Sequence, residues 1–207
     1  VAESQQGVAP IRAGRFHVLT PHHEPLPSAV NLIIPAAQAF GTGHHATTAG
    51  CLAMLDAMKR GGVHARNLAD IGSGTGLLAF AAMHLWPRAA AIASDIDPVC
   101  AEVVRENAAL NRMPLQLVVA DGMDHPALQA REPFDLLIAN ILALPLIDLA
   151  PEFALALVPG GNLVLAGLLE TQESAVRVAY RRYGFRLRRR LVKGDWSVLW
   201  LGKSRVR

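Results

Sequence analysis

Glycine and aspartate alternate in one short segment in a way that suits a bound small molecule. Residues 70–76 read D-I-G-S-G-T-G, where Asp70 precedes three alternate glycines, Gly72, Gly74 and Gly76. Glycines let a ligand approach the backbone closely because they carry no Cβ. Dinucleotide sites use the spacing G-x-G-x-x-G, and the third position of that pattern is a leucine here. The segment therefore favours a nucleoside without a pyrophosphate, such as S-adenosylmethionine, over a nicotinamide dinucleotide.

Two later acidic positions could hold the rest of a nucleoside. Asp95 ends an apolar run, and a carboxylate there can accept hydrogen bonds from both hydroxyls of a ribose. Ile96 follows it directly, and we place it in the same site. Asp121 and Gly122 end the next apolar run, where a side chain and a backbone could meet the edge of an adenine. Together with the glycines, these positions predict a nucleoside site rather than a plain turn between a strand and a helix.

Asn140, in the segment A-N-I-L-A, is the residue best suited to orient a nucleophile. Its side-chain oxygen can accept hydrogen bonds from an amine and so direct the lone pair of the amine towards a methyl group. A lysine amine has a pKa near ~10.4 and must lose a proton before attack, which an apolar slot would favour by desolvation. The alternative is that Asn140 only ends a strand.

The segment A-F-G-T-G-H-H-A-T-T at residues 39–48 predicts a flexible loop ahead of a helix. Gly41 and Gly43 give the loop its freedom, and Phe40 could form a wall of the site. Thr47 or Thr48 could cap the helix that follows.

Histidine is common in the chain, and it raises the question of a metal or a base. There are eight histidines, but adjacent pairs do not easily point at one ion, and the two cysteines are far apart. We therefore expect no metal site. His44 or His45 could accept a proton in the loop, or could only shape it by hydrogen bonds to the backbone.

Apolar runs and helical periodicity alternate along the chain, and this order should bring the polar positions together. Short apolar runs predict strands over residues 15–19, 30–34, 67–71, 90–94, 115–119, 134–139, 162–166, 185–192 and 196–201. Helical spacing predicts helices over residues 47–59, 77–86, 98–111, 146–157 and 170–183, the fourth stopped by a Pro-Gly-Gly segment at residues 159–161. The alternation implies an α/β fold with a parallel sheet, helices on both faces and an antiparallel terminal hairpin.

The composition is that of one domain with a large core. The chain has 207 residues, of which 52% are hydrophobic and 18% charged, with two cysteines. This excludes a disordered chain and a disulfide scaffold, and it suits a reducing cytoplasm. The longest apolar stretch, residues 136–159, is broken by polar residues and prolines, so we expect no membrane span. The chain starts at a valine, and we expect it to be a fragment or a trimmed chain.

Charge is unevenly distributed along the sequence. Residues 177–207 contain eleven Lys and Arg side chains and one acid, Asp195, whereas residues 1–176 carry a net negative charge. A basic end can be a solvated face of a helix and strands, which we favour, or a surface for nucleic acid.

Four segments together resemble the PrmA family, the bacterial methyltransferases of large-subunit ribosomal protein eleven. They are the loop at residues 39–48, the glycine turn at 70–76, the acidic segment at 93–98 and the A-N-I-L-A segment at 139–143, in the family's order and spacing. The resemblance covers about residues 7–203. It implies a Rossmann-like S-adenosylmethionine-dependent methyltransferase fold with a mostly parallel seven-stranded sheet and an antiparallel C-terminal hairpin. It also implies a cytoplasmic protein N-methyltransferase that adds methyl groups to lysine and N-terminal amines of its ribosomal substrate.

The resemblance also assigns residue roles. Thr48, Gly72, Asp95 and Asn140 should contact the cofactor. Phe40, Gly41, Thr42 and Gly43 should form the active-site loop, and the expected catalytic residues are Asn140, Thr42 and His45. A serine stands at residue 73 where a cysteine is usual in the family, and an alanine follows His45 where many members have proline.

The family carries an N-terminal substrate-recognition domain, and the resemblance implies that this chain begins near the linker after that domain. We expect residues 1–35 to be a linker and N-terminal extension, and residues 36–207 to be a monomeric methyltransferase domain. Two other functions stay open, a methyltransferase of another protein amine or small molecule and a non-catalytic module that binds RNA or the ribosome.

Overall fold

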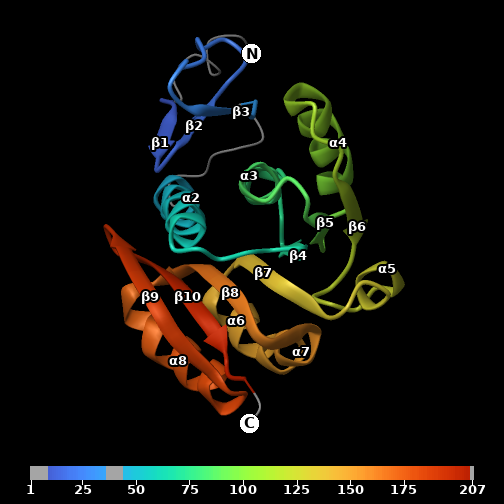
Figure 1. The fold of residues 1–207 in the computed structure, drawn as a ribbon, viewed down its shortest axis with the longest axis vertical. Helices are drawn as coiled ribbons and strands as arrows, with labels where there is room; N and C mark the ends of the chain where they lie inside the picture. Colours follow the sequence, from blue (N-terminus) through green and yellow to red (C-terminus); the bar gives the residue numbers. More distant parts are fainter. Residues whose placement is uncertain (1–8, 36–43, 206–207) are drawn as a thin grey trace.

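A twisted sheet of seven strands forms the centre of the molecule (Figure 1). The computed structural model describes residues 9–35 and 44–205. The strands lie in the order β6-β5-β4-β7-β8-β10-β9. Their bounds are β4 Asn67–Ile71, β5 Ala90–Asp95, β6 Gln116–Val119, β7 Phe134–Asn140, β8 Leu157–Leu169, β9 Phe185–Lys193 and β10 Trp196–Lys203.

Strand direction follows the expectation from the sequence. β6, β5, β4, β7 and β8 are mutually parallel, and β10 runs antiparallel to both of its neighbours, β8 and β9. The predicted α/β fold with a mostly parallel sheet and a C-terminal hairpin is confirmed. The last strand of the chain, β10, lies inside the sheet, and β9 forms the edge.

Helices cover both faces of the sheet, and the strands are apolar on both sides for this reason. Neighbouring strand residues alternate between two cores, as with Leu136 and Leu137 or Val198 and Leu199. The first core also holds buried residues of α2 His44–Arg60, α3 Leu77–Leu85 and α4 Val99–Asn111. The second holds those of α5 Pro126–Gln129, α6 Ala143–Asp148, α7 Ala150–Ala156 and α8 Glu173–Arg182.

None of the helices in the described part of the chain combines the length and the apolar character needed to cross a membrane.

A small second sheet precedes the main one and packs on the first core. It consists of β1 Ile11–Ala13, β2 Phe16–Leu19 and β3 Val30–Ile33, and Figure 1 shows it above α2 and α3. Phe16 and Leu32 are 1% and 2% exposed within the first core. The side chain of Asn111 on α4 donates to the carbonyl of Ile33 and accepts from its amide, both at 2.8 Å. These contacts fasten the N-terminal strands to the main domain.

Three expectations about local structure were wrong. Residues 146–157 do not form one helix, because α6 ends at Asp148 and α7 begins at Ala150, with proline in its first turn. The Pro-Gly-Gly segment at residues 159–161 does not follow a helix but lies within β8, where the pairing with β7 shifts register. Neither Thr47 nor Thr48 caps a helix, since α2 already begins at His44.

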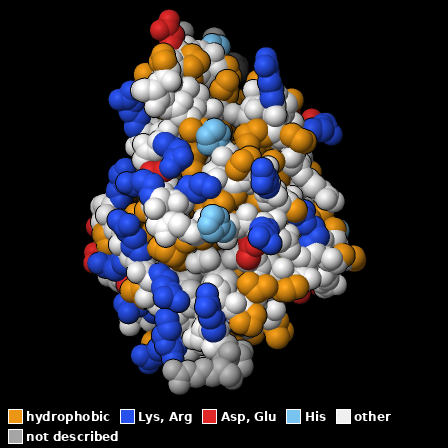
Figure 2. All heavy atoms as spheres, viewed as in Figure 1, with side chains coloured by type: hydrophobic (Ala, Val, Ile, Leu, Met, Phe, Trp, Pro, Cys, Tyr) orange, Lys and Arg blue, Asp and Glu red, His pale blue; other side chains and the backbone are white. Residues whose placement is uncertain are grey.

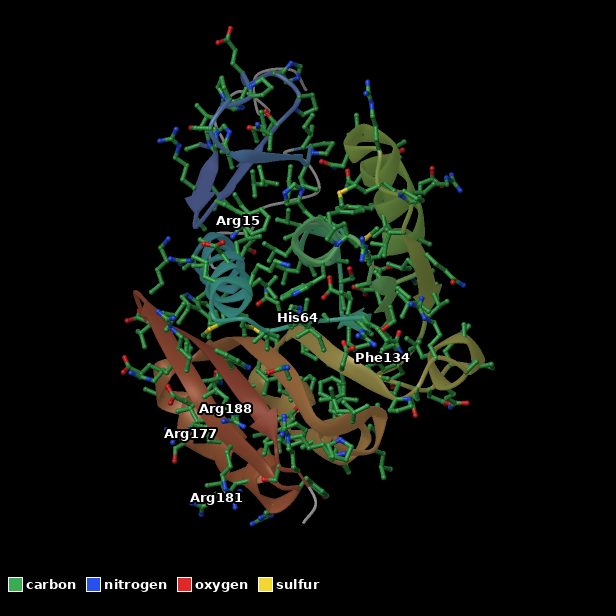
Figure 3. The ribbon with its side chains drawn as sticks, in the orientation of Figure 1. Arg15, His64, Phe134, Arg177, Arg181 and Arg188 are labelled. Carbon is green, nitrogen blue, oxygen red and sulfur yellow. The ribbon has the colours of Figure 1, made fainter. Side chains whose placement is uncertain are left out.

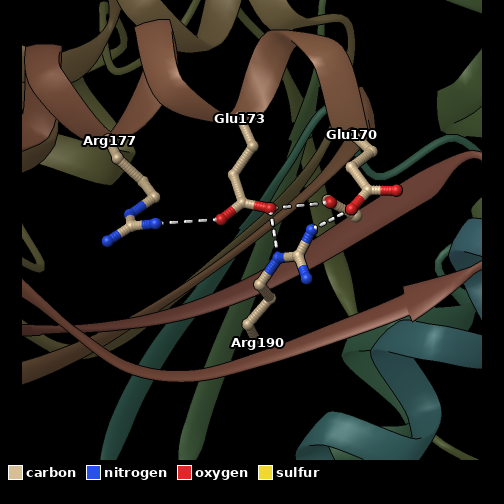
Figure 4. Close-up of polar contacts among 5 residues, drawn as sticks. Glu170, Glu173, Arg177 and Arg190 are labelled. Atoms are coloured by element: carbon tan, nitrogen blue, oxygen red, sulfur yellow. Dashed lines mark hydrogen bonds and ion pairs between the residues drawn. The ribbon is translucent and has the colours of Figure 1, made fainter.

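A buried carboxylate joins α8 to the C-terminal hairpin (Figure 4). Glu173 is 5% exposed and accepts hydrogen bonds from Arg190 on β9, Ser197 on β10 and Arg177 on its own helix. Arg190 also pairs with Glu170. Burial alone would raise the pKa of Glu173, but these hydrogen bonds and the charge of Arg190 outweigh it and lower the pKa below its usual value.

Candidate active site

The predicted ligand-binding positions meet at the carboxyl ends of the parallel strands. In the register of the sheet, Ile71 at the end of β4 lies opposite Ser94 on one side and Ala139 on the other. Asp95 and Asn140, the next residues along these two neighbours, therefore flank the glycine turn. After β4, the chain continues to β5 on one side of β4 and then to β6. It returns to β7 on the other side of β4, so the strand order reverses at β4, which is the switch point of the sheet. Ligands of open α/β sheets bind at such points.

The glycine turn has the backbone conformation that its sequence predicts. Gly72, Gly74 and Gly76 have φ values of 68°, 57° and 81°, which only glycine adopts without strain. A Cβ on Gly72 would lie 2.2 Å from Cγ2 of Ile141, so this turn also packs closely against the segment after β7. Among the described residues, no heavy atom lies within 4 Å of the position that a Cβ on Gly74 would take, which leaves space over the middle of the turn.

Asp95 binds the backbone of the glycine turn and can accept further hydrogen bonds from a ligand. Its Oδ2 accepts from the amide of Gly74 at 2.8 Å, and its Oδ1 accepts from the amide of Asp97 at 3.0 Å. The Cys100 side chain also hydrogen-bonds to Asp95, and a carboxylate has about four lone-pair sites, so acceptor capacity remains for a ligand hydroxyl. Asp95 is 9% exposed, so its charge lies in a sheltered position beside the turn.

Asp70 supports the same turn from inside the protein. It is 1% exposed, and its Oδ2 accepts from the Ser73 hydroxyl at 2.9 Å and from the amide of Ala79 in α3 at 3.0 Å. Burial raises the pKa of Asp70 to about 7, against the lowering effect of these two hydrogen bonds, and the nearby charge of Asp95 adds to the increase. In this structure Asp70 connects the turn to the start of α3.

The segment after β6 holds the residues that we predict to contact the adenine. The amide of Ala120 donates to the carbonyl of Asp95 at 2.9 Å, which places the start of the β6 loop next to the acidic segment. Asp121 is exposed there, and Gly122 is buried with a φ of 56° and packs against Leu149. Ile96 is 67% exposed, so its side chain is accessible beside this segment.

Asn140 presents an unsatisfied acceptor at the same edge. Its Oδ1 is buried and has no hydrogen-bond partner among the described residues. Buried polar atoms are nearly always paired, so this acceptor is a candidate partner for a ligand; Ser94 Oγ and Asn107 Oδ1 are likewise buried and unpaired among the described residues. Asn140 lies opposite Ala166 of β8, and the Ile141 that follows it fills the space between two glycines, Gly72 and Gly167.

The predicted loop falls largely outside the described residues. Phe40, Gly41, Thr42 and Gly43 lie in the segment that the structure does not describe, as does the side chain of His45. Thr48 is described and lies half-buried in the N-terminal part of α2. No group of three metal-ligating side chains occurs within residues 9–35 and 46–205.

Two residues with a role in the geometry were missed by sequence reasoning. Asn107 in α4 is fully buried and donates from Nδ2 to the carbonyl of Thr75 in the glycine turn at 3.0 Å. Gly167 in β8 has a φ of 82°, and a Cβ there would lie 2.3 Å from the carbonyl oxygen of Ile141. Asparagine is unusual inside a helix, which was a signal for Asn107. Gly167 gave no signal, because its role depends on a residue from another element.

Comparison with known proteins agrees with this geometry. The family model described as ribosomal protein L11 methyltransferase (PrmA) matches residues 1–204. The chain belongs to this family. Relatives named ribosomal protein L11 methyltransferase include one from Caulobacter sp. (strain K31), 45% identical over 96% of this chain and 69% of its own length. Another, from Mesorhizobium japonicum, is 44% identical over 97% of this chain and 70% of its own length.

Solved structures of methyltransferases share the fold of this chain. A ribosomal protein L11 methylase from Lactobacillus delbrueckii subsp. bulgaricus has a TM-score of 0.82 and 28% identity, over 95% of this chain and 100% of that one. A methyltransferase from Pyrococcus furiosus, at 18% identity and a TM-score of 0.58, covers 69% of this chain and 76% of its own and shares the fold. The expected family and the Rossmann-like methyltransferase fold are confirmed.

Proposed function

We propose that this chain transfers methyl groups from S-adenosylmethionine to amines of ribosomal protein L11, at lysine side chains and at the N-terminal amine. The observation that carries the proposal is the buried and unpartnered Oδ1 of Asn140, at the same sheet edge as the Gly74–Asp95 contact. The names of the relatives support the choice of substrate. A ribosomal substrate supports a cytoplasmic location for the proposed reaction.

The residues at the sheet edge fit a nucleoside. Asp95 would accept from the ribose hydroxyls, and Ile96, Asp121 and Gly122 would surround the adenine. The positive φ of Gly74 and the open space above it suit close approach of the ligand to the turn. Thr48 and the loop residues Phe40, Gly41, Thr42 and Gly43 would contact the methionine end. In the bound state S-adenosylmethionine supplies an electrophilic methyl group.

Asn140 would orient the nucleophile. Its Oδ1 can only accept, so it binds an N–H of the incoming amine and directs the lone pair of the nitrogen without taking a proton. Alignment of this kind contributes several kcal/mol to catalysis, up to about 7–11 kcal/mol in ideal cases. Leu142 and Leu144 lie beyond Asn140 and are 69% and 73% exposed. Once the bound substrate covers these side chains, their apolar surface would lower the pKa of the amine by desolvation and so increase its neutral fraction.

Other parts of the proposal concern the loop and the division of the chain. Thr42 and His45 would complete the catalytic set, with His45 as an acceptor for the proton that the amine loses. Residues 36–207 would form the methyltransferase domain, and residues 1–35 an extension whose strands pack on it.

The test combines binding and transfer. We expect calorimetry to show binding of S-adenosylhomocysteine and no binding of NAD. With labelled S-adenosylmethionine and purified ribosomal protein L11, mass spectrometry should find added methyl groups on lysine and N-terminal amines. Binding without transfer to L11 would refute the substrate assignment. Failure to bind S-adenosylhomocysteine would refute the nucleoside site itself.

A further inference from the structure

A hollow lined by basic side chains lies at the amino ends of the strands, at the opposite end of the sheet from the proposed active site. Its lining includes Lys59 at the end of α2, His64 and Arg66 just before β4, and Arg88 just before β5. These residues precede their strands, so they lie at the amino ends, whereas Asp95 and Asn140 lie at the carboxyl ends. A ligand in this hollow would leave the proposed active site accessible.

A second group of basic side chains lies on α8 and β9. Arg181 and Arg186 line a hollow between these two elements, and Arg188 lies beside it on β9 against Gly202 of β10. In Figure 2 Lys and Arg side chains gather over β9, over α2 and around the centre of the view, with few acidic side chains among them. Figure 3 labels His64, Arg188 and Arg181 one below another in the same orientation. We call Lys59, Arg66, Arg88, Arg181, Arg186 and Arg188 the basic face.

Within the described residues, no ion pair holds the side chains of the basic face, although the Asp135 carboxylate accepts from the backbone amide of Arg66. Ion pairs occupy Arg177 and Arg190, which bind Glu173 and Glu170. None of the six members of the basic face forms an ion pair with another described residue. Unpaired charges of one sign add up to a positive surface potential, which attracts an anionic partner.

We propose that the basic face binds the phosphate backbone of RNA. A guanidinium group matches a phosphate through two parallel hydrogen bonds, and five of the six members are arginines. A protein partner would need an apolar centre to its interface. Trp86, the large apolar side chain of the first hollow, is instead only 4% exposed. The choice of RNA also rests on the proposed function, because a ribosomal protein works in contact with RNA.

Binding of a fluorescein-labelled RNA hairpin, followed by anisotropy at several salt concentrations, tests this inference. Each phosphate contact contributes about 0.7–0.9 to the slope of log K against log salt, so six contacts predict a slope of about −4 to −5. Two variants each remove two charges, Arg66→Gln with Arg88→Gln and Arg181→Gln with Arg188→Gln. Each should reduce the size of the slope by about 1.4–1.8 and weaken binding about tenfold or more at low salt.

The matched control removes two charges from a different surface, through Arg12→Gln on β1 and Arg112→Gln just after α4, neither of which forms an ion pair with another described residue. RNA affinity of this control should stay near that of the wild type. An equal loss in the control would mean that net charge alone drives binding and would overturn the inference. A slope near zero, or equally tight binding of labelled polyglutamate, would also overturn it, the latter in favour of an acidic protein partner.

Binding of S-adenosylhomocysteine and methyl transfer to isolated L11 separate this inference from the proposed function. Cofactor binding and methyl transfer should both be unchanged in the basic-face variants, because the two sites lie at opposite ends of the strands. RNA binding without methyl transfer would leave the inference standing and refute the function, and the reverse result would refute the inference alone.

Discussion

Gly167→Ala should impair methyl transfer through a collision with the backbone beside Asn140. Gly167 follows Ala166, the residue paired with Asn140, and has a φ of 82°. A Cβ there would lie 2.3 Å from the carbonyl oxygen of Ile141 and 2.8 Å from its carbonyl carbon. Backbone atoms cannot rotate away as a side chain can, so the peptide after Asn140 must shift by about 1 Å to reach ordinary contact.

Two costs follow from this geometry, and they can be separated. A residue with a Cβ in the left-handed conformation costs about 1–2 kcal/mol of folding free energy. A displacement of about 1 Å at a catalytic group costs about 100-fold in rate, or roughly 2.7 kcal/mol. Gly184→Ala is a matched control, because Gly184 has a φ of 83° and a Cβ there would meet no heavy atom within 4 Å.

The assay measures kcat for methyl transfer to L11, affinity for S-adenosylhomocysteine and the free energy of unfolding. Both variants should lose about 1–2 kcal/mol of stability from backbone strain, with a further loss for Gly167→Ala from the collision. Only Gly167→Ala should lose kcat, by about 100-fold, with cofactor affinity unchanged. Equal kcat in the two variants would refute the reasoning. A parallel loss of kcat and of S-adenosylhomocysteine affinity would show that Gly167 supports the cofactor instead.

Three more predictions concern the remaining polar groups. Asp95→Ala should weaken S-adenosylhomocysteine binding by roughly 1–3 kcal/mol in calorimetry through lost hydrogen bonds, and unchanged affinity would contradict the ribose assignment. Asn140→Ala should lower kcat more than cofactor affinity, whereas a matched loss would make it a binding residue only. The pKa of Glu173 is lowered on folding, so its stabilising effect is present above the unfolded value of about 4.3 and is lost as pH falls through the folded value. Glu173→Gln should therefore be less stable than the wild type near neutral pH. In urea titrations at decreasing pH, this variant should lack the loss of stability that Glu173 causes in the wild type. A loss equal to that of the wild type would disprove the role of Glu173.

Much of the main sheet could be predicted because its strands carry their own signal. The strand at residues 67–71 is bounded as expected, since a strand covered on both faces is a short apolar run. The turn after it was predictable for a similar reason, because Gly72, Gly74 and Gly76 follow one another along the chain.

Features that depend on distant residues were not predictable. The break between α6 and α7 at Leu149 is different, because Pro151, in the first turn of α7, was a local signal that the sequence analysis did not use. The strand content of residues 157–161 depends on pairing of Leu157 with Phe134 of β7. Asn107 and Gly167 likewise act on the site through Thr75 and Ile141, which come from other elements.

The interior position of β10 has a consequence for synthesis of the protein. β10 leaves the ribosome after β8 and β9, yet it pairs with both of them. Until it is released, β8 has an open edge along an apolar strand whose Leu163, Leu165 and Leu168 are buried in the finished protein. Unpaired apolar edges recruit other strands, so a chain terminated before β10 should aggregate rather than fold to a smaller sheet. Synthesis of β10 is thus a condition for closing the sheet between β8 and β9.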